Sequence, residues 1–199
     1  MTTLVILRDE NKIFLGADRR STWGTIINDH RMETKIVQKP HMFITATGES
    51  LYLALASMIA DKMSVSLEND ASEIVHEFIS LLDEHLKSFE GLSETSDDDF
   101  SSTILLLVKG RIFGVSLTNR QYDYSYEIKD QFHSRGTGEF IARGMYLYLK
   151  TTDSSNGLIM KKIFEEVPFL DSASGGGAVI YEYDLDSFNA KTIYEWKNE

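Results

Sequence analysis

The sequence has no cysteine and only two prolines in 199 residues. Without cysteine, neither disulfide bonds nor thiolate chemistry is available to the protein. The two prolines, Pro40 and Pro168, stand far apart, so no proline-rich linker divides the chain. We therefore predict one domain over residues 1–199, a length that is enough to bury a substantial core.

Long apolar runs and basic clusters are also missing. No stretch approaches the about 20 apolar residues of a membrane-spanning helix. The first residues, MTTLVILRDE, lack the basic and apolar regions of a signal peptide. The formal net charge is −11 and lysine and arginine form no run, which disfavours a nucleic-acid partner. We expect a cytoplasmic protein with neither a nucleic-acid nor a membrane partner.

Familiar catalytic motifs are present only in incomplete form. The segment GTGEFI has Ile141 where the dinucleotide-binding fingerprint requires its third glycine. The segment SASGG has Ser172 in place of the first glycine of a nucleophile elbow. The five histidines show no ligand spacing of the H-E-x-x-H kind. We therefore expect no metal site and no required cofactor.

Hydrophobic periodicity predicts strands that are interrupted twice by pairs of helices. Helices are expected over 51–62, over 69–89, after Gly138 and over 158–167. Residues 22–27 and 35–37 are expected to pair across the polar turn at 28–30, and Lys109-Gly110 is expected to close a tight hairpin. The remaining strands are expected over 3–7, 12–17, 42–47, 103–108, 111–117, 122–126, 131–134, 178–183 and 191–196. This order predicts an α+β fold in which antiparallel sheets carry helices on their outer faces.

The second residue offers chemistry that the incomplete motifs do not. Once Met1 is removed, Thr2 carries a hydroxyl nucleophile and a free α-amine in one residue. The amine has an ordinary pKa of about 7.7–8.0, so it can accept a proton near neutral pH. Many proteins begin Met-Thr, so this dipeptide alone carries little weight.

An ordered set of distant motifs gives the threonine its significance. Thr2-Thr3 is followed by GADRRSTWG at 16–24, by Lys35-Ile36 and by Gly48, then by SRGTG at 134–138 and DSASGG at 171–176. In this order, and over nearly the whole chain, the set resembles the proteasome β-type subunits, a family that includes the bacterial HslV peptidase. Its members begin Thr-Thr and carry the patterns G/A-D-x-x-x-T-x-G, S-x-G-S-G and D-x-x-S-G-G.

The resemblance implies an N-terminal nucleophile hydrolase fold. This is an α+β, four-layer αββα sandwich, with two antiparallel sheets between two helical layers. It also implies that Thr2 is the nucleophile and that Lys35 lies beside it and lowers its proton affinity. Asp18 would hold the lysine ammonium by a charge-assisted hydrogen bond.

Further roles follow from the same resemblance. The backbone N–H of Gly48 would stabilise the oxyanion, and Thr22 would pair with the substrate backbone like an added strand. A polar network around the Thr2 amine would be formed by Thr137, Asp171 and Ser174. Small residues resemble the lining of the specificity pocket and predict room for a large apolar side chain: Ser21, Val37, Ala46, Ser50 and Ala54.

Two positions depart from the family pattern. Lys35 follows Asp18 at an interval one residue longer than usual, which we interpret as an insertion in the turn at 28–31. If that interpretation is wrong, Thr34 would face the site and catalysis would fail. Thr137 replaces the usual serine but keeps the hydroxyl, so its hydrogen bonding should survive.

The resemblance further implies a threonine-type peptidase that cleaves unfolded polypeptide inside a homo-oligomeric ring. Access would be controlled by an ATP-dependent unfoldase or by a narrow pore, and a monovalent cation near Asp171–Ser174 is a candidate ligand. Two alternatives stay open. One is a catalytically inactive ring subunit that retains Met1 and acts as a scaffold, and the other is a hydrolase of the same broad fold that acts on small amides.

Overall fold

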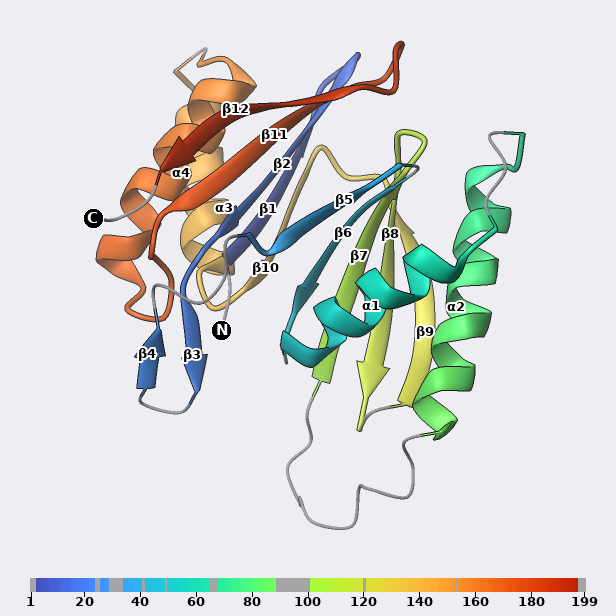
Figure 1. Cartoon of the computed structure of the whole chain (residues 1–199). Helices are drawn as coiled ribbons and strands as arrows, with labels where there is room; N and C mark the ends of the chain where they lie inside the picture. Colours follow the sequence, from blue (N-terminus) through green and yellow to red (C-terminus); the bar gives the residue numbers. More distant parts are fainter. Residues whose placement is uncertain are drawn as a thin grey trace. The chain divides into compact units, whose positions relative to one another are not determined.

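The computed structural model describes residues 3–23, 26–28, 34–40, 42–48, 50–64, 68–88, 101–119, 121–152 and 154–196, with the backbone alone at 21–23, 26–28 and 50. The chain divides into two units, residues 1–36 with 129–199 and residues 37–128. Each unit contains a five-stranded sheet and is described by itself (Figure 1). The expectation of one domain over 1–199 stays a prediction.

The sheet of the first unit is antiparallel throughout and has the order β10-β1-β2-β11-β12. Its central strands are buried because they are built from apolar runs; Thr3 to Leu7 are all buried. The pairing sets Leu4 opposite Ala17. The strands are β1 (Thr3–Arg8), β2 (Lys12–Asp18), β10 (Phe132–Gly136), β11 (Ala178–Asp184) and β12 (Ala190–Trp196).

Two helices, α3 (Glu139–Lys150) and α4 (Asn156–Leu170), pack on one face of this sheet (Figure 1). The buried face of α4 meets β1 and β2 in an apolar core that includes Val5, Phe164 and Val167. Gly16 permits this approach, since a Cβ there would lie 2.3 Å from Cε2 of Phe164. Helix α3 begins three residues after β10, and α4 ends at Leu170, directly before Asp171.

The strands after β2 differ from the prediction. Strand β3 (Ser21–Trp23) pairs with β4 (Ile26–Asn28), with Trp23 opposite Ile26. The predicted single strand over 22–27, paired with 35–37, is therefore wrong. Only two residues, the first of them Gly24, separate the paired ends, which is the length and composition of a tight hairpin connection. The polar turn expected at 28–30 lies largely outside the described residues.

The second unit has a sheet of order β5-β6-β7-β8-β9, formed by β5 (Ile36–Lys39), β6 (Met42–Thr47), β7 (Ser101–Val108), β8 (Arg111–Thr118) and β9 (Gln121–Ile128). The predicted hairpin at Lys109-Gly110 is confirmed, because Val108 pairs with Arg111. Lys109 and Gly110 have φ values of 47° and 74°, as the turn between two such strands requires.

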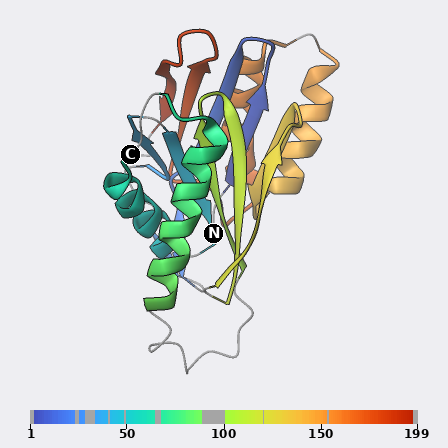
Figure 2. The same ribbon diagram turned by 90° about the vertical axis from the view of Figure 1, so that its right-hand side faces the viewer.

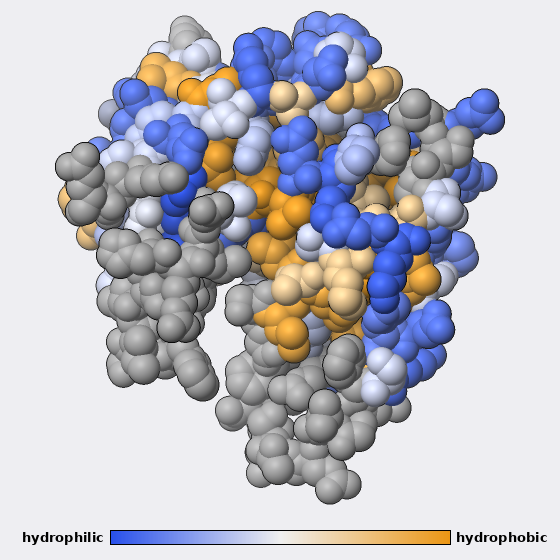
Figure 3. Space-filling model, viewed as in Figure 1, coloured by the Kyte–Doolittle hydropathy of each residue, from blue (hydrophilic) through white to orange (hydrophobic). Residues whose placement is uncertain are grey.

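Helices α1 (Ser50–Lys62) and α2 (Ala71–Ser88) pack on one face of this second sheet (Figure 2). Helix α2 begins with part of a capping box, since the backbone N–H of Asp70 donates to the Glu73 carboxylate at 2.9 Å. Apolar residues also gather on the outer surface of α1, where Leu51 is 60% exposed (Figure 3). The order of the elements along the chain is strands, two helices, strands, two helices and two strands. The predicted order of strands and paired helices is therefore confirmed.

Candidate active site

Asp18, the last residue of β2, is the centre of the candidate site. Its carboxylate oxygen Oδ1 accepts hydrogen bonds from Lys35 Nζ at 2.7 Å and from the backbone N–H of Thr3 at 2.8 Å. The other oxygen, Oδ2, accepts from the backbone N–H of Gly175 at 3.0 Å. One carboxylate therefore joins β1, β2, the residue before β5 and the loop before β11.

The ion pair of Asp18 and Lys35 is almost fully enclosed, with exposed fractions of 1% and 3%. Burial raises the pKa of the Asp18 carboxyl, while the Lys35 ammonium and the N–H groups of Thr3 and Gly175 oppose that rise. Buried charges persist in proteins when they are paired and hydrogen-bonded. The pair therefore keeps a cation at a fixed place beside the first strand.

The extended interval between Asp18 and Lys35 does not misdirect the lysine. Lys35 reaches Asp18, whereas the hydroxyl of Thr34 lies 3.0 Å from both the backbone N and the carbonyl oxygen of Ile36. Thr34 is thus engaged by its own backbone, in the manner of a threonine turn. The structure brings together the two residues that the motifs paired, and their catalytic roles stay predictions.

A second carboxylate, that of Asp171, follows the end of α4. Its Oδ2 accepts hydrogen bonds from the hydroxyls of Ser174 at 2.6 Å and Thr137 at 2.7 Å, and its Oδ1 accepts from the Ala173 N–H at 3.0 Å. Burial raises the pKa of Asp171, but these hydrogen bonds and the Arg20 guanidinium outweigh it and hold the pKa below its ordinary value. Asp171 is therefore an anion that accepts hydrogen bonds from two hydroxyl groups.

Thr3 links the two carboxylates, and the sequence motifs gave it no role. Its backbone N–H donates to Asp18, and its hydroxyl is hydrogen-bonded to that of Ser174. Gly138 makes room for this contact, because a Cβ there would lie 2.2 Å from Oγ1 of Thr3. Thr2 itself lies outside the described residues, but it is covalently bonded to the backbone nitrogen that Asp18 holds.

The predicted oxyanion residue, Gly48, lies in the second unit and directly follows β6. Its φ of +99° is one that favours glycine. A Cβ at this position would lie 2.2 Å from Oγ of Ser102, so no larger residue fits. These facts explain the glycine locally, and the oxyanion role stays a prediction.

The predicted substrate-binding residues are spread over four elements. Ala46 in β6 is buried, Val37 in β5 is half-buried, and Ala54 in α1 is exposed. The side chains of the other three predicted residues lie outside the described part of the chain: Ser21 and Thr22 in β3 and Ser50 at the start of α1. The specificity pocket therefore stays a prediction.

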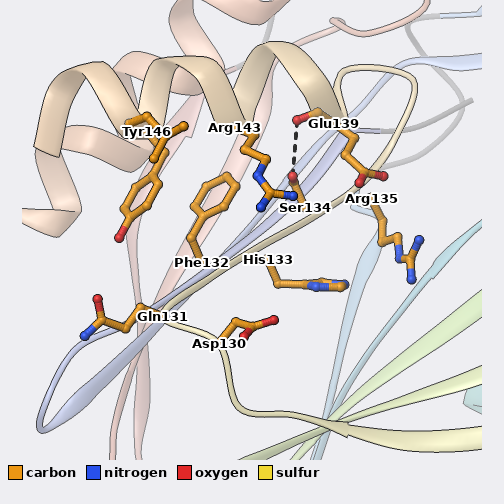
Figure 4. Close-up of a pocket in the computed structure, with 10 residues that line it drawn as sticks. Asp130, Gln131, Phe132, His133, Ser134, Arg135, Glu139, Arg143 and Tyr146 are labelled. Atoms are coloured by element: carbon orange, nitrogen blue, oxygen red, sulfur yellow. Dashed lines mark hydrogen bonds between the residues drawn. The ribbon is translucent and has the colours of Figure 1, made fainter.

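A separate pocket of about 400 Å³ lies between the segment 130–135 and helix α3 of the first unit, and none of the predicted site residues lines it (Figure 4). Phe132 and Tyr146 stack on its wall with their ring centroids 4.4 Å apart. Burial, together with the nearby Arg135, lowers the pKa of His133 to about 4. The pocket thus holds a neutral imidazole and is not part of the carboxylate site.

Two negative findings apply to the described ranges. No group of three or more histidine, aspartate or glutamate side chains is arranged there to hold a metal ion. No helix among those residues has both the length and the apolar character to cross a membrane.

Comparisons with known proteins find similarity at the level of structure. Neither the models of known protein families nor the curated proteins give a match. The chain is similar to BPH from Thiobacillus denitrificans, with a TM-score of 0.67 and 20% identity, and to BPH in complex with epoxomicin, with a TM-score of 0.68 and 17% identity. Both alignments cover 92% of this chain and 98% of BPH. It is also similar to the eukaryotic HslV from Trypanosoma brucei, with a TM-score of 0.61 and 14% identity over 92% of this chain and 99% of HslV.

The last of these structures is an HslV, a protein of the family that the motifs resemble. The resemblance predicted from the motifs is therefore confirmed for the fold: the described residues form an α+β fold with two five-stranded antiparallel sheets and four helices, as in these structures. At such low identity the similarity concerns the fold, so the activity has to be argued from the site itself.

Proposed function

We propose that the protein is a threonine-type peptidase that uses Thr2 as its N-terminal nucleophile after removal of Met1. The observation that carries this proposal is the position of Thr3. Its backbone N–H shares the Asp18 carboxylate with the Lys35 ammonium, and its hydroxyl bonds to Ser174 of the Asp171 network. Both polar clusters therefore converge on the residue next to Thr2.

The chemistry follows from the charges in these clusters. A fixed cation near the Thr2 hydroxyl favours its deprotonated form, and the free α-amine accepts the proton as general base. The hydroxyl oxygen attacks the peptide carbonyl, and the leaving amine takes up the proton. Water then hydrolyses the resulting ester and frees Thr2. The Gly48 N–H is the proposed oxyanion donor, a role typically worth about 3–4 kcal/mol in the transition state.

Asp18 and Asp171 serve different purposes in this scheme. Asp18 holds the lysine and the Thr3 N–H, so it fixes the position of the cation. Asp171 orients the hydroxyls of Thr137 and Ser174, which would in turn orient the amine of Thr2. A monovalent cation near Asp171–Ser174 remains a further proposal, and no step above uses it.

The proposal extends to the setting of the reaction. The protein would assemble as a homo-oligomeric ring in the cytoplasm, act on unfolded polypeptide and receive it from an ATP-dependent unfoldase or through a narrow pore. The small pocket residues would accept a large apolar side chain before the cut. The complex of BPH with epoxomicin suggests the same compound as a probe for this chain.

The test compares hydrolysis of an unfolded reporter polypeptide by the wild type and by Thr2→Ala, Asp18→Asn and Lys35→Gln. Each substitution is expected to lower kcat at least about 100-fold, the usual contribution of a group that takes part in proton transfer. Lys12→Gln is the matched control, because Lys12 is an exposed lysine that also pairs with a carboxylate, that of Glu182 at 2.9 Å. If Thr2→Ala hydrolyses the reporter as fast as the wild type does, the proposal is contradicted.

Turnover of small amides, sedimentation and the presence of Met1, measured on the same protein, separate the alternatives. Turnover of small amides alone, by a stable monomer or dimer in sedimentation, would indicate a small-amide hydrolase. A ring that retains Met1 and cleaves neither kind of substrate would indicate a scaffold.

A further inference from the structure

We propose that Arg20 is a positioning residue, which holds the loop Asp171–Gly175 so that the Asp171 and Ser174 side chains face Thr3. This inference rests on the proposed function and adds to it a residue that the sequence motifs left as a variable position. Arg20 lies in the connection from β2 to β3, two residues after Asp18. It is therefore anchored to the same strand end as the buried carboxylate.

Three contacts join Arg20 to the loop. Its Nη1 donates to the carbonyl oxygen of Ser172 at 2.7 Å, and its backbone N–H donates to the carbonyl oxygen of Gly175 at 2.7 Å. The guanidinium also approaches Gly175 closely, since a Cβ there would stand 2.9 Å from Cζ and from Nη2 of Arg20. The Arg20 side chain thus contacts the loop at two places, Ser172 and Gly175.

The loop Asp171–Gly175 contains polar groups of the candidate active site. Asp171 and Ser174 lie within it, and the N–H of Gly175 donates to Asp18 at 3.0 Å. A shift of the loop at Gly175 would therefore disturb both carboxylates at once. Arg20 acts through the loop and not on the reacting atoms, which is why it is a positioning residue.

Electrostatics support this role. The positive charge of Arg20 acts on Asp171 and helps to hold the pKa of that carboxyl below its ordinary value. The planar guanidinium donates in a fixed direction and stays charged at every working pH. It can therefore hold the loop and favour the anionic Asp171 together.

The neighbouring Arg19 provides a matched control. Its backbone N–H also donates to the carbonyl oxygen of Gly175 in the loop and to that of Gly177 beyond it, but its guanidinium donates to Glu195 of β12 at 2.6 Å. Replacing the Arg19 side chain removes a guanidinium from the same segment and leaves the contacts of Arg20 with Ser172 in place.

The experiment measures kcat for the wild type, Arg20→Gln, Arg20→Lys and Arg19→Gln, and follows the pKa of the Asp171 carboxyl in the same proteins. In Arg20→Gln we expect kcat to fall about tenfold and the Asp171 pKa to rise, because Asp171 loses a nearby cation. Arg20→Lys keeps the charge, so the Asp171 pKa should stay low while kcat falls. Arg19→Gln should leave the Asp171 pKa as it is in the wild type.

A second readout separates this inference from the proposed function. The Asp171 carboxyl can be titrated by NMR in the wild type and in Arg20→Gln, with no need for turnover. If the wild type shows no hydrolysis, the proposed function fails, and the titration alone decides the role of Arg20. An Asp171 pKa that is equal in the two proteins, or one that rises equally in Arg19→Gln, would overturn the inference. If Arg20→Gln does not fold, Arg20→Lys decides, because an unchanged kcat there would contradict a role for the guanidinium fork.

Discussion

Replacing Lys35 by methionine should destabilise the protein strongly, because it leaves the Asp18 carboxylate buried without its cation. Removing one partner of a buried ion pair costs about 3–5 kcal/mol. Asp18 would keep two backbone donors, the N–H groups of Thr3 and Gly175. We therefore expect the lower end of that range, about 3 kcal/mol, for Lys35→Met at pH 7.

The assay is urea unfolding of the wild type, Lys35→Met, Asp18→Asn and the double variant at pH 7 and pH 5. The double variant should be more stable than Lys35→Met, because it no longer buries an unpaired charge. Burial raises the folded-state pKa of Asp18 above its ordinary value, and removing Lys35 raises it further. The stability of Lys35→Met should therefore recover as the pH falls and Asp18 takes up a proton.

A loss below about 1 kcal/mol in Lys35→Met, which is the range of exposed ion pairs, would refute this account of the pair. A loss that is the same at pH 7 and pH 5 would refute it as well. Lys12→Met is the control, because Lys12 is exposed and its partner Glu182 keeps a second ion pair with Lys191 at 3.1 Å, so the change should cost less than about 1 kcal/mol.

Three further predictions follow from the described residues. Gly48→Ala should cost more than about 1–3 kcal/mol in urea unfolding, because its φ is +99° and a Cβ would lie 2.2 Å from Ser102 Oγ; a neutral effect would contradict the local geometry. Gly144→Ala, at a helix position with nothing within 4 Å of the added Cβ, should instead stabilise by about 0.5–1 kcal/mol, and a loss there would contradict the open surface of α3. His133 has a pKa lowered from 6.5 to about 4, so the folded state resists its protonation and stability should fall as the pH drops from 6.5 towards 4. The loss should be about 1–2 kcal/mol after allowance for partial exposure, and His133→Gln should remove that part of the pH dependence; an unchanged slope would show that the imidazole is not shielded.

Local signals were enough for most of the secondary structure. The hairpin at Lys109-Gly110 was predictable, because a two-residue connection that contains a glycine stands between two apolar runs. Helix α4 extends beyond the predicted 158–167 to Asn156–Leu170, and Pro168 lies within its last turn. The pairing of residues 22–27 failed because it was argued from hydrophobicity, while Gly24 was the signal that the run is broken.

The candidate site also contains residues that the sequence predicted and residues that it did not. Motifs identified Asp18 and Lys35, because their residue types carry the chemistry, and the structure shows them 2.7 Å apart. Thr3 and Arg20 were missed, because their contacts run through backbone atoms and through a loop that is distant in sequence. The residue type alone, a threonine or an arginine at a variable position, does not predict such a contact. The only sequence signal was indirect: glycines at the positions where those side chains approach, of which Gly138 is one.

The central claim is that Thr2 becomes an N-terminal nucleophile, and peptide mapping by mass spectrometry tests it most directly. The protein is made in its own host, treated with a threonine-directed electrophile and mapped, with Thr2→Ala as the control. The account predicts that Met1 is absent, that Thr2 carries the label in the wild type and that the control stays unlabelled. A retained Met1 with no label on Thr2 would contradict it.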